Sequence, residues 1–293
     1  MAIKDSAGRR LFNLSNILFL CLLTMATLYP MLFVVFASFS NPARFVAFRG
    51  VLLHPLGFYT QAYRFVFRNP MFLTGYANTL TVVAAGVCLN LFMTSLGAYF
   101  LSRKQVMFKA PIMFLITFTM FFGGGLIPFY LTVRDLKLDN TLLALFVPFA
   151  INTFNMIILR TAFMSVPDSL EESARIDGAS HYVILFKIIA PVSLPTMAVM
   201  VLYYGVGHWN AWFWAFVFLR ERTLYPLQLV LREILIQNTM TDMTSSVDTG
   251  DAFLVGEIIK YATIVVATAP ILALYPFLQK YFVKGIMIGA LKG

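Results

Sequence analysis

Residues that could carry chemistry are few in this chain and lie far apart. The three histidines are His54, His181 and His208, and no cysteine, histidine or carboxylate group has the spacing of a metal site. No nucleophile motif and no G-x-x-x-x-G-K-[ST] phosphate-binding loop is present. The sequence therefore predicts no catalytic residue, no metal site and no cofactor site in this chain.

One polar stretch, SLEESARIDGASHYVILFKIIAP at residues 169–191, lies between long apolar runs. Pro167 ends the preceding helix, and Asp168 or Ser169 can cap a new one. Glu171 or Glu172, three residues later, would complete a capping box in either register. These signals predict that a helix begins at this point.

The same stretch predicts two short helices. Gly178 is placed to end the first in a left-handed conformation, and a second is expected over residues 181–189, up to Pro191. Two short helices joined at a glycine would form a compact knob that can dock in a groove on another protein. The alternative is an ordinary structured loop.

The composition indicates what holds this stretch in place. Hydrophobic residues make up 60% of the 293 residues, charged residues only 12%, and the mean hydropathy is +0.80. These values are typical of a polytopic membrane protein. Each apolar run is long enough to cross a hydrocarbon core of about 30 Å as a helix, and none alternates as a membrane strand does. We therefore expect an all-α fold with six transmembrane helices, near residues 14–38, 73–101, 111–132, 141–163, 191–219 and 258–282.

Charge distribution predicts the orientation. A cytoplasmic basic tail at residues 1–13 places Arg103, Lys104 and Lys109 on the same side, although other arginines fall on the opposite side. The first run is too long for a signal peptide and is expected to be a retained anchor. The prediction is one membrane domain over residues 14–282, with a cytoplasmic loop at 164–191, an external loop at 220–257 and a cytoplasmic tail at 283–293.

Three further segments have features of their own. FFGGGLIP at residues 121–128 indicates either close helix packing or an unwound turn lining a cavity.

Residues 227–236 predict an amphipathic helix, with Leu227, Val230, Leu231, Ile234 and Leu235 on one side, and residues 238–251 predict a polar loop. Residues 39–72 contain four arginines and no carboxylate, namely Arg44, Arg49, Arg64 and Arg68. This last segment is either an interfacial aromatic anchor or a basic vestibule for an anionic solute.

The polar stretch also carries a recognisable spacing. Glu172-Ser173-Ala174, three residues, Gly178, nine residues, Ile188 and then Ala190-Pro191 resembles the EAA loop of ATP-binding-cassette (ABC) importer permeases. Ser173 replaces an alanine and Ala190 a leucine, and the spacing is intact. The segments GGGLIPFYL, LDNTLLALFVP, INTFNMIILR, WNAWF and YPLQLVLREIL look like carbohydrate-importer permeases of the MalG-like subgroup, including oligosaccharide and alginate-type systems.

The resemblance implies the transmembrane-domain fold of a type I ABC importer. The chain would pair with a second homologous permease subunit, two ATPase subunits that bind ATP and Mg, and an extracytoplasmic solute-binding protein. It would lie in a bacterial cell (inner) membrane with both termini cytoplasmic. Glu172, Ala174, Asp177 and Gly178 would couple to the ATPase, although Asp177 can instead satisfy the end of its own helix.

A sugar path calls for aromatic faces and amide groups. The candidates with these groups are Asn152, Asn155, Trp209, Asn210, Trp212 and Trp214. Asparagines in spans also serve as hydrogen bonds between helices, and tryptophans as interface anchors. By the resemblance, the other membrane subunit is an alternative place for sugar contacts.

Other classes of protein fit less well. An ion-coupled secondary sugar carrier places acidic residues or histidines within its spans, whereas here the carboxylates lie at boundaries and loops, with Glu257 the nearest exception. The net charge of +9 is spread over membrane flanks, which disfavours nucleic-acid binding. The predicted function is that of a permease subunit, not an enzyme, of an ATP-driven carbohydrate importer. The arginines of residues 39–72 favour an acidic glycan as substrate.

Overall fold

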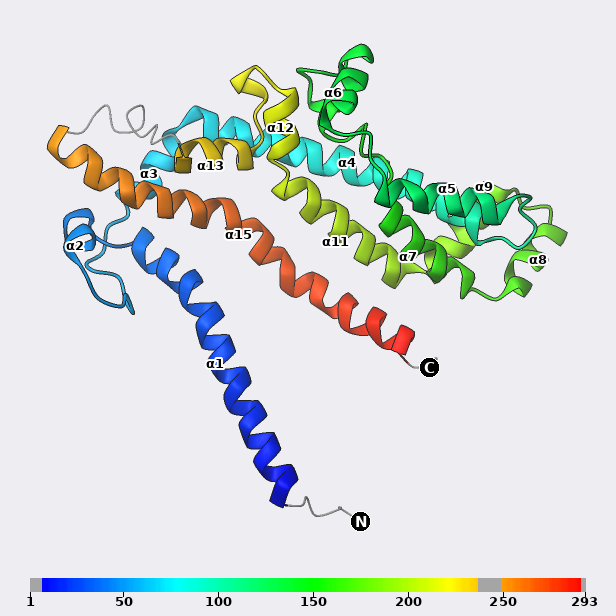
Figure 1. The fold of residues 1–293 in the computed structure, drawn as a ribbon, viewed down its shortest axis with the longest axis horizontal. Helices are drawn as coiled ribbons and strands as arrows, with labels where there is room; N and C mark the ends of the chain where they lie inside the picture. Colours follow the sequence, from blue (N-terminus) through cyan, green and yellow to red (C-terminus); the bar gives the residue numbers. More distant parts are fainter. Residues whose placement is uncertain (1–6, 237–248, 291–293) are drawn as a thin grey trace. The chain divides into compact units, whose positions relative to one another are not determined.

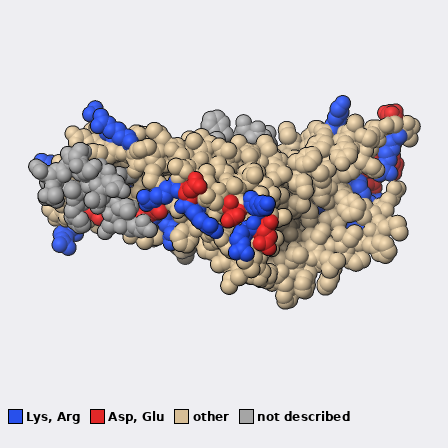
Figure 2. All heavy atoms as spheres, turned by 90° about the horizontal axis from the view of Figure 1, so that it is seen from above, with Lys and Arg blue, Asp and Glu red and all other residues tan. Residues whose placement is uncertain are grey.

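All regular secondary structure in the described part of the chain is helical (Figure 1), and no strand occurs in it. The computed structural model describes residues 7–236 and 249–290. The chain divides into two compact units, one of residues 1–69 with 233–268 and one of residues 70–232 with 269–293. On the face drawn in Figure 2, the charged side chains of the described residues form only a few groups among the uncharged ones, as the composition predicts.

The first unit contains α1 (Ala7–Ser38), α2 (Pro42–Ala47), α3 (Gln61–Arg68) and the first part of α15 (Thr249–Ala290). The ring of Tyr261 on α15 packs edge-on against Phe33 and Phe45, with centroids 5.8 and 5.4 Å away. The Tyr63 hydroxyl lies 2.7 Å from Ser38 Oγ and ties α3 to the end of α1. Most large apolar side chains along α1 are exposed, which fits a helix that faces lipid or another subunit.

The second unit is built around α4 (Pro70–Ser102), with α7 (Thr153–Met164) and α11 (Leu194–Asn210) packed along it. Small residues of α4 permit close approach. A Cβ on Gly86 would come within 2.6 Å of the His208 ring. In Figure 1, α5 (Lys109–Phe121), α7 and α9 (His181–Ile184) gather at one end of α4. Leu159, Phe163, Ile184 and Leu185 are buried together there.

Six continuous membrane helices are not found, and this part of the prediction requires correction. In the described residues, three helices are long and apolar enough to span: Gly8–Ser38, Pro70–Ser102 and Leu254–Ala273. Two bent pairs raise the number to five if each pair is one span. The predicted span at residues 141–163 is instead a short turn, η1 (Leu142–Leu145), followed by the 12-residue α7. Pro148, which has no N–H, lies in the break, and Asn152 caps α7.

The glycine-rich segment in the third run is an unwound turn. Helix α5 ends at Phe121, α6 (Leu126–Asp135) begins after a break of four residues, and the two are bent by 112°. A Cβ added at Gly123, Gly124 or Gly125 would meet nothing within 4 Å. Close packing within this chain is therefore not the reason for these glycines. Gly125 has φ of +86° and ψ of 171°, a conformation that essentially only glycine adopts.

Pro191 does not end the second knob helix as predicted. After α9, a π-helical turn (Leu185–Ile189) leads into α10 (Ala190–Val192), and the chain then bends by 90° before α11. Pro191 lies in the first turn of α10, where a missing N–H costs little. The bend therefore falls at Ser193, two residues beyond the proline.

The predicted amphipathic helix is present as α13 (Leu227–Ile236), after α12 (Phe213–Phe218) and η3 (Arg222–Leu224). Its beginning is fixed to α4, since Leu227 N donates to Thr79 Oγ1 at 2.8 Å. A Cβ on Gly75 would lie 3.3 Å from the Leu227 backbone. Leu227 and Val230 are buried as expected, Leu229 is buried as well, and Leu235 is exposed. The helix is thus packed on protein. Of the polar loop predicted at 238–251, residues 238–248 lie outside the described residues.

Candidate coupling site

The knob predicted from the polar stretch is formed by α8 (Asp168–Ile176) and α9. Helix α8 ends at Ile176 with Asp177 as its C-cap, and Gly178 follows with φ of +77°, as the sequence predicts. The side chain of Ser180 then caps α9 by accepting a hydrogen bond from Val183 N at 3.4 Å. The two helices are therefore separated by a tight turn with defined backbone geometry at both ends.

The predicted capping box at the start of α8 does not form. Pro167 occupies the position before the helix, with no side-chain cap. The Asp168 carboxylate pairs with the Lys104 ammonium 2.5 Å away, and the Glu171 side chain turns inward. Both carboxylates therefore bind cations, and α8 has no side-chain cap at its start.

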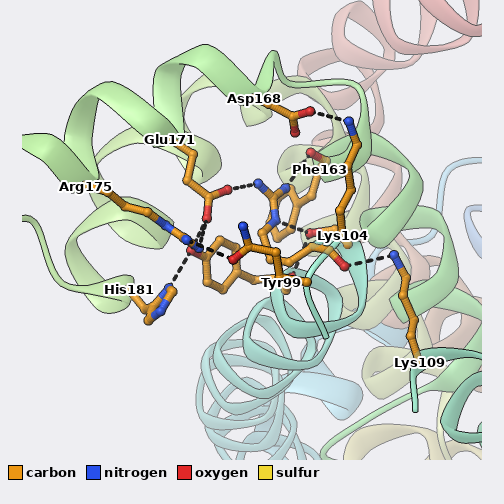
Figure 3. A network of polar contacts seen from close by, with 11 residues as sticks. Tyr99, Lys104, Lys109, Phe163, Asp168, Glu171, Arg175 and His181 are labelled. Atoms are coloured by element: carbon orange, nitrogen blue, oxygen red, sulfur yellow. Dashed lines mark hydrogen bonds and ion pairs between the residues drawn. The ribbon is translucent and has the colours of Figure 1, made fainter. Parts of the chain in front are cut away.

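Glu171 is the centre of a buried polar network (Figure 3). Its Oε2 accepts from Arg103 Nη1, its Oε1 accepts from Arg175 Nη2 at 2.6 Å, and the Tyr99 hydroxyl donates to Oε1 at 3.4 Å. The side chains of Glu171 and Arg103 are only 8% and 11% exposed. The carboxylate is thereby held from α4, from the segment after it and from α8 itself.

Arg103 extends the network to a third helix. Its Nη2 donates to the Phe163 carbonyl at 3.0 Å, and its Nε donates to Ser102 Oγ at 2.9 Å. Phe163 lies in the last turn of α7, so one guanidinium ties the ends of α4 and α7 to α8. We call Glu171, Arg103 and Arg175 the brace.

The charges of the brace are mutually stabilising. Burial by itself would raise the pKa of Glu171, but hydrogen bonds and charge from Arg103 and then Arg175 outweigh it, so the pKa lies below its ordinary value. Lys104 and Asp168 also shift each other, mainly through their hydrogen bond, which raises the pKa of Lys104 and lowers that of Asp168. This second pair is exposed and contributes little to stability.

Two more cations bind carbonyl groups at the end of α4. Arg160 Nε donates to the Leu101 carbonyl at 2.9 Å, and Lys109 Nζ donates to the Arg103 carbonyl at 3.0 Å. Positive groups at a helix C-terminus satisfy its free carbonyls and interact favourably with its dipole. The end of α4 is therefore a fixed point for its neighbours.

The predicted coupling residues divide into an outer and an inner set. Glu172, Asp177 and Gly178 are exposed, and beside them Ile176 leaves 87% of its surface uncovered. Ala174 is buried and packs against the core of this chain. Sequence reasoning missed the brace. It assigned Glu171 only a capping role and used Arg103 only as a topology marker.

The six predicted substrate-path residues do not converge on one place. Asn152 Oδ1 accepts from Asn155 N at 3.0 Å, and Asn152 N donates to the Tyr204 hydroxyl at 3.2 Å. Trp209 is buried, with its ring 6.0 Å from that of Tyr76. The Asn152 side chain thus caps α7 on the backbone N–H of Asn155, and Trp209 of α11 packs against Tyr76 of α4.

The other three lie at and after the end of α11. Asn210 is exposed at its last residue, and the Trp212 ring lies under the Arg232 guanidinium at 4.6 Å. Trp214 stacks on Phe218 with centroids 5.5 Å apart and meets Phe129 edge-on at 4.9 Å. Trp214 is therefore part of an aromatic cluster, and the exposed residues among the six are Asn152, Asn210 and Trp212.

A second polar group lies within the packed helices and was not predicted. Asn90 Oδ1 lies 2.7 Å from His208 Nε2, and its amide donates to the Phe149 carbonyl at 2.6 Å. The hydroxyls of Thr94 and Tyr204 are 2.7 Å apart. Each bond joins α4 to another segment, as polar residues between membrane helices commonly do. In the described part of the chain, no three His, Cys, Asp or Glu side chains are grouped closely enough to hold a metal ion.

The fold and the site together define a class of protein: a helical, multi-pass membrane protein that displays a braced, capped knob outside its apolar helices. Such a knob has the form of a docking element for another subunit.

Comparison with known proteins gives the family. The chain is 39% identical to the polygalacturonan/rhamnogalacturonan transport system permease protein YtcP of Bacillus subtilis, over 97% of this chain and 99% of the relative. It is 40% identical to protein LplC of the same organism, over 99% and 98%. No family model matches the sequence.

Comparison with solved structures supports the same family. A chain of a bacterial ABC transporter involved in the import of the acidic polysaccharide alginate superposes with a TM-score of 0.87 at 33% identity, over 96% of this chain and 100% of that one. This chain belongs to the family of carbohydrate ABC transporter permeases. The resemblance seen in the EAA-like spacing, and the all-helical membrane fold, are confirmed.

Proposed function

We propose that this permease subunit forms half of a translocation path and receives its driving force through the outer face of α8. The observation that carries the proposal is the brace, a buried network that fixes α8 to the ends of α4 and α7. A partner ATPase would supply the energy from ATP, and a second permease subunit would complete the path.

The knob suits this role mechanically. The movement of a docked partner becomes helix motion only if the docking element does not deform by itself. Because the brace orders α8 in advance, docking would cost little conformational entropy. The exposed Ile176 offers an apolar contact, and Glu172 and Asp177 offer charge-assisted hydrogen bonds at its sides. Gly178 provides the turn that presents them.

We propose an acidic oligosaccharide as the substrate class, delivered by an extracytoplasmic solute-binding protein. One relative is named for polygalacturonan and rhamnogalacturonan, and the solved structure is named for the acidic polysaccharide alginate. In this chain, Arg44 and His54 line a pocket of about 420 Å³ that includes Phe48. A cation beside an aromatic ring suits a sugar that carries a carboxylate.

We propose that the knob and both termini face the cytoplasm of a bacterial cell. Arg103, Lys104, Lys109 and Arg160 gather at the knob end of α4, and cytoplasmic ends of membrane helices are enriched in such residues. Ser173→Cys tests this placement, because the residue is exposed on α8. A membrane-impermeant thiol reagent should label it only in permeabilised cells, and labelling in intact cells would reverse the orientation.

The coupling proposal is tested by recovery of the ATPase with the tagged permease. Ile176→Asp should lower the affinity for the ATPase by about 30-fold or more, as for a central interface residue that contributes about 2 kcal/mol. Glu172→Ala should weaken it less. Asp135→Ala is the matched control, since this exposed carboxylate lies at the end of α6. Normal transport and normal ATPase recovery in Ile176→Asp and Glu172→Ala would exclude the outer face of α8 as the docking surface.

A further inference from the structure

A groove of about 460 Å³ opens between the last turns of α4, the segment after it and the start of α9. Its apolar wall is formed by Leu96, Phe100, Val106 and Leu185. The polar part of its lining is contributed by Tyr99, Arg103, Gln105, Arg175, His181 and Tyr182. Among the described residues that line it, none is Asp or Glu. We call these six polar residues the rim. The groove therefore combines an apolar wall with a rim that carries only basic or neutral groups.

The rim is anchored by the brace. The Arg175 side chain is 38% exposed, and its Nη1 donates to Gln105 Oε1 at 3.3 Å while its Nη2 holds Glu171. The Tyr99 hydroxyl lies 3.1 Å from His181 Nδ1. Figure 3 shows Arg175 and His181 on the same side of Tyr99. Two guanidiniums share the single carboxylate of Glu171, so one positive charge is left uncompensated within the brace.

The apolar wall continues along a membrane helix. Phe92, Leu96 and Phe100 are spaced four residues apart and so lie on one face of α4, which is long enough to span. The Phe92 ring stacks on that of Phe186 with centroids 6.0 Å apart, and both side chains are exposed. An apolar strip therefore leads from the basic rim into the membrane-spanning part of α4.

We propose that this groove binds an anionic phospholipid from the leaflet on the knob side. The phosphate would lie at Arg175 and His181, and an acyl chain would follow Phe100, Leu96 and Phe92. A soluble anion would leave the apolar strip uncovered, and a zwitterionic lipid would bring an ammonium group to a basic rim. Basic pockets beside membrane helices are suited to anionic headgroups. This site is additional to the coupling role, although it shares Arg175 with the brace.

The site is tested with the full-length chain, purified with whichever subunits accompany it, in nanodiscs of phosphatidylglycerol and phosphatidylcholine with matched acyl chains. Native mass spectrometry counts the lipids that remain after mild delipidation. Gln105→Glu adds a carboxylate beside Arg175 and should weaken phosphatidylglycerol retention about fivefold, the effect of one unit of charge at a membrane surface. Met107→Glu is the matched control, because it adds the same charge to the same exposed loop outside the groove.

The wild type should retain phosphatidylglycerol over phosphatidylcholine, Met107→Glu should behave like it, and excess inorganic phosphate should not displace the lipid. Equal retention of the two lipids by the wild type would overturn the proposal without need of a variant. Equal retention of phosphatidylglycerol by the wild type and Gln105→Glu would overturn it also. Displacement by inorganic phosphate would show a site for a soluble anion instead.

Discussion

At the scale of single residues, neighbouring glutamates have different roles. Glu171 is buried and bound by Arg103, Arg175 and Tyr99, whereas Glu172, the glutamate of the EAA-like spacing, is exposed on α8. A motif identifies Glu172 because it matches a spacing. Glu171 is identified only by its contacts, because its partner Arg103 lies 68 residues away along the chain.

Glu171→Gln tests the brace directly. The variant keeps the size of the side chain but removes the charge that balances Arg103, so we expect a loss of about 1–3 kcal/mol of stability. The thermal unfolding temperature of the purified chain measures this loss. Glu172→Gln, at an exposed position, should change stability by no more than about 0.5 kcal/mol. Equal unfolding temperatures for Glu171→Gln and the wild type would mean that the network does not hold α8.

The pH dependence has a defined sign. Because the folded-state pKa of Glu171 is lowered, its ionised form stabilises the fold above its ordinary pKa of about 4.3, and this stabilisation is lost as the pH falls through the lowered value. The difference in unfolding temperature between wild type and Glu171→Gln should stay constant from about pH 5 to 8 and shrink below about pH 4. A difference that grew on acidification would contradict the assigned charge state.

At the scale of elements, two sharp bends in the chain coincide with breaks between helices. Helices α5 and α6 meet at 112° across Phe122–Gly125, and the segment before α11 bends by 90° at Ser193. At the first bend, the glycine run predicted either close helix packing or an unwound turn, and the structure has the unwound turn. The second bend was not predicted: the sequence placed a helix end at Pro191, because a proline is a visible signal in a sequence and a π-turn has none.

Gly125→Ala probes the first bend. At φ of +86° and ψ of 171° a Cβ is strained, so we expect a loss of about 1–3 kcal/mol, although there is space for the methyl group. Gly123→Ala is the matched control, since it has open space and no positive φ. The unfolding temperatures of the two variants separate strain from crowding. Equal values would show that the turn tolerates side chains at both positions.

The sequence predicted individual helices and turns more successfully than it predicted which elements pack against each other. The short helix α8, the left-handed Gly178 and the amphipathic α13 were predicted, since each has a local signal. The docking of α13 on α4 through Gly75 and Thr79 was not, because it joins residues about 150 positions apart. The single long span at 141–163 failed because hydropathy averages over the break at Pro148.

At the scale of the whole molecule, the chain is a permease of the carbohydrate ABC transporter family, and we propose that a separate subunit supplies its energy. Its family membership rests on relatives 39% and 40% identical over nearly all of the chain. In the proposed coupling, the brace would give this subunit a rigid point for receiving force, and that force would pass to the ends of α4 and α7. Transport should accordingly depend on a separate source of energy.

Uptake of a labelled acidic oligosaccharide into proteoliposomes tests this dependence most directly. The chain reconstituted with its companion permease, ATPase and solute-binding protein should accumulate the sugar against its gradient only when ATP is supplied on the knob side. The chain by itself should not accumulate it under any ion gradient. Uphill accumulation by the purified chain alone would contradict the account.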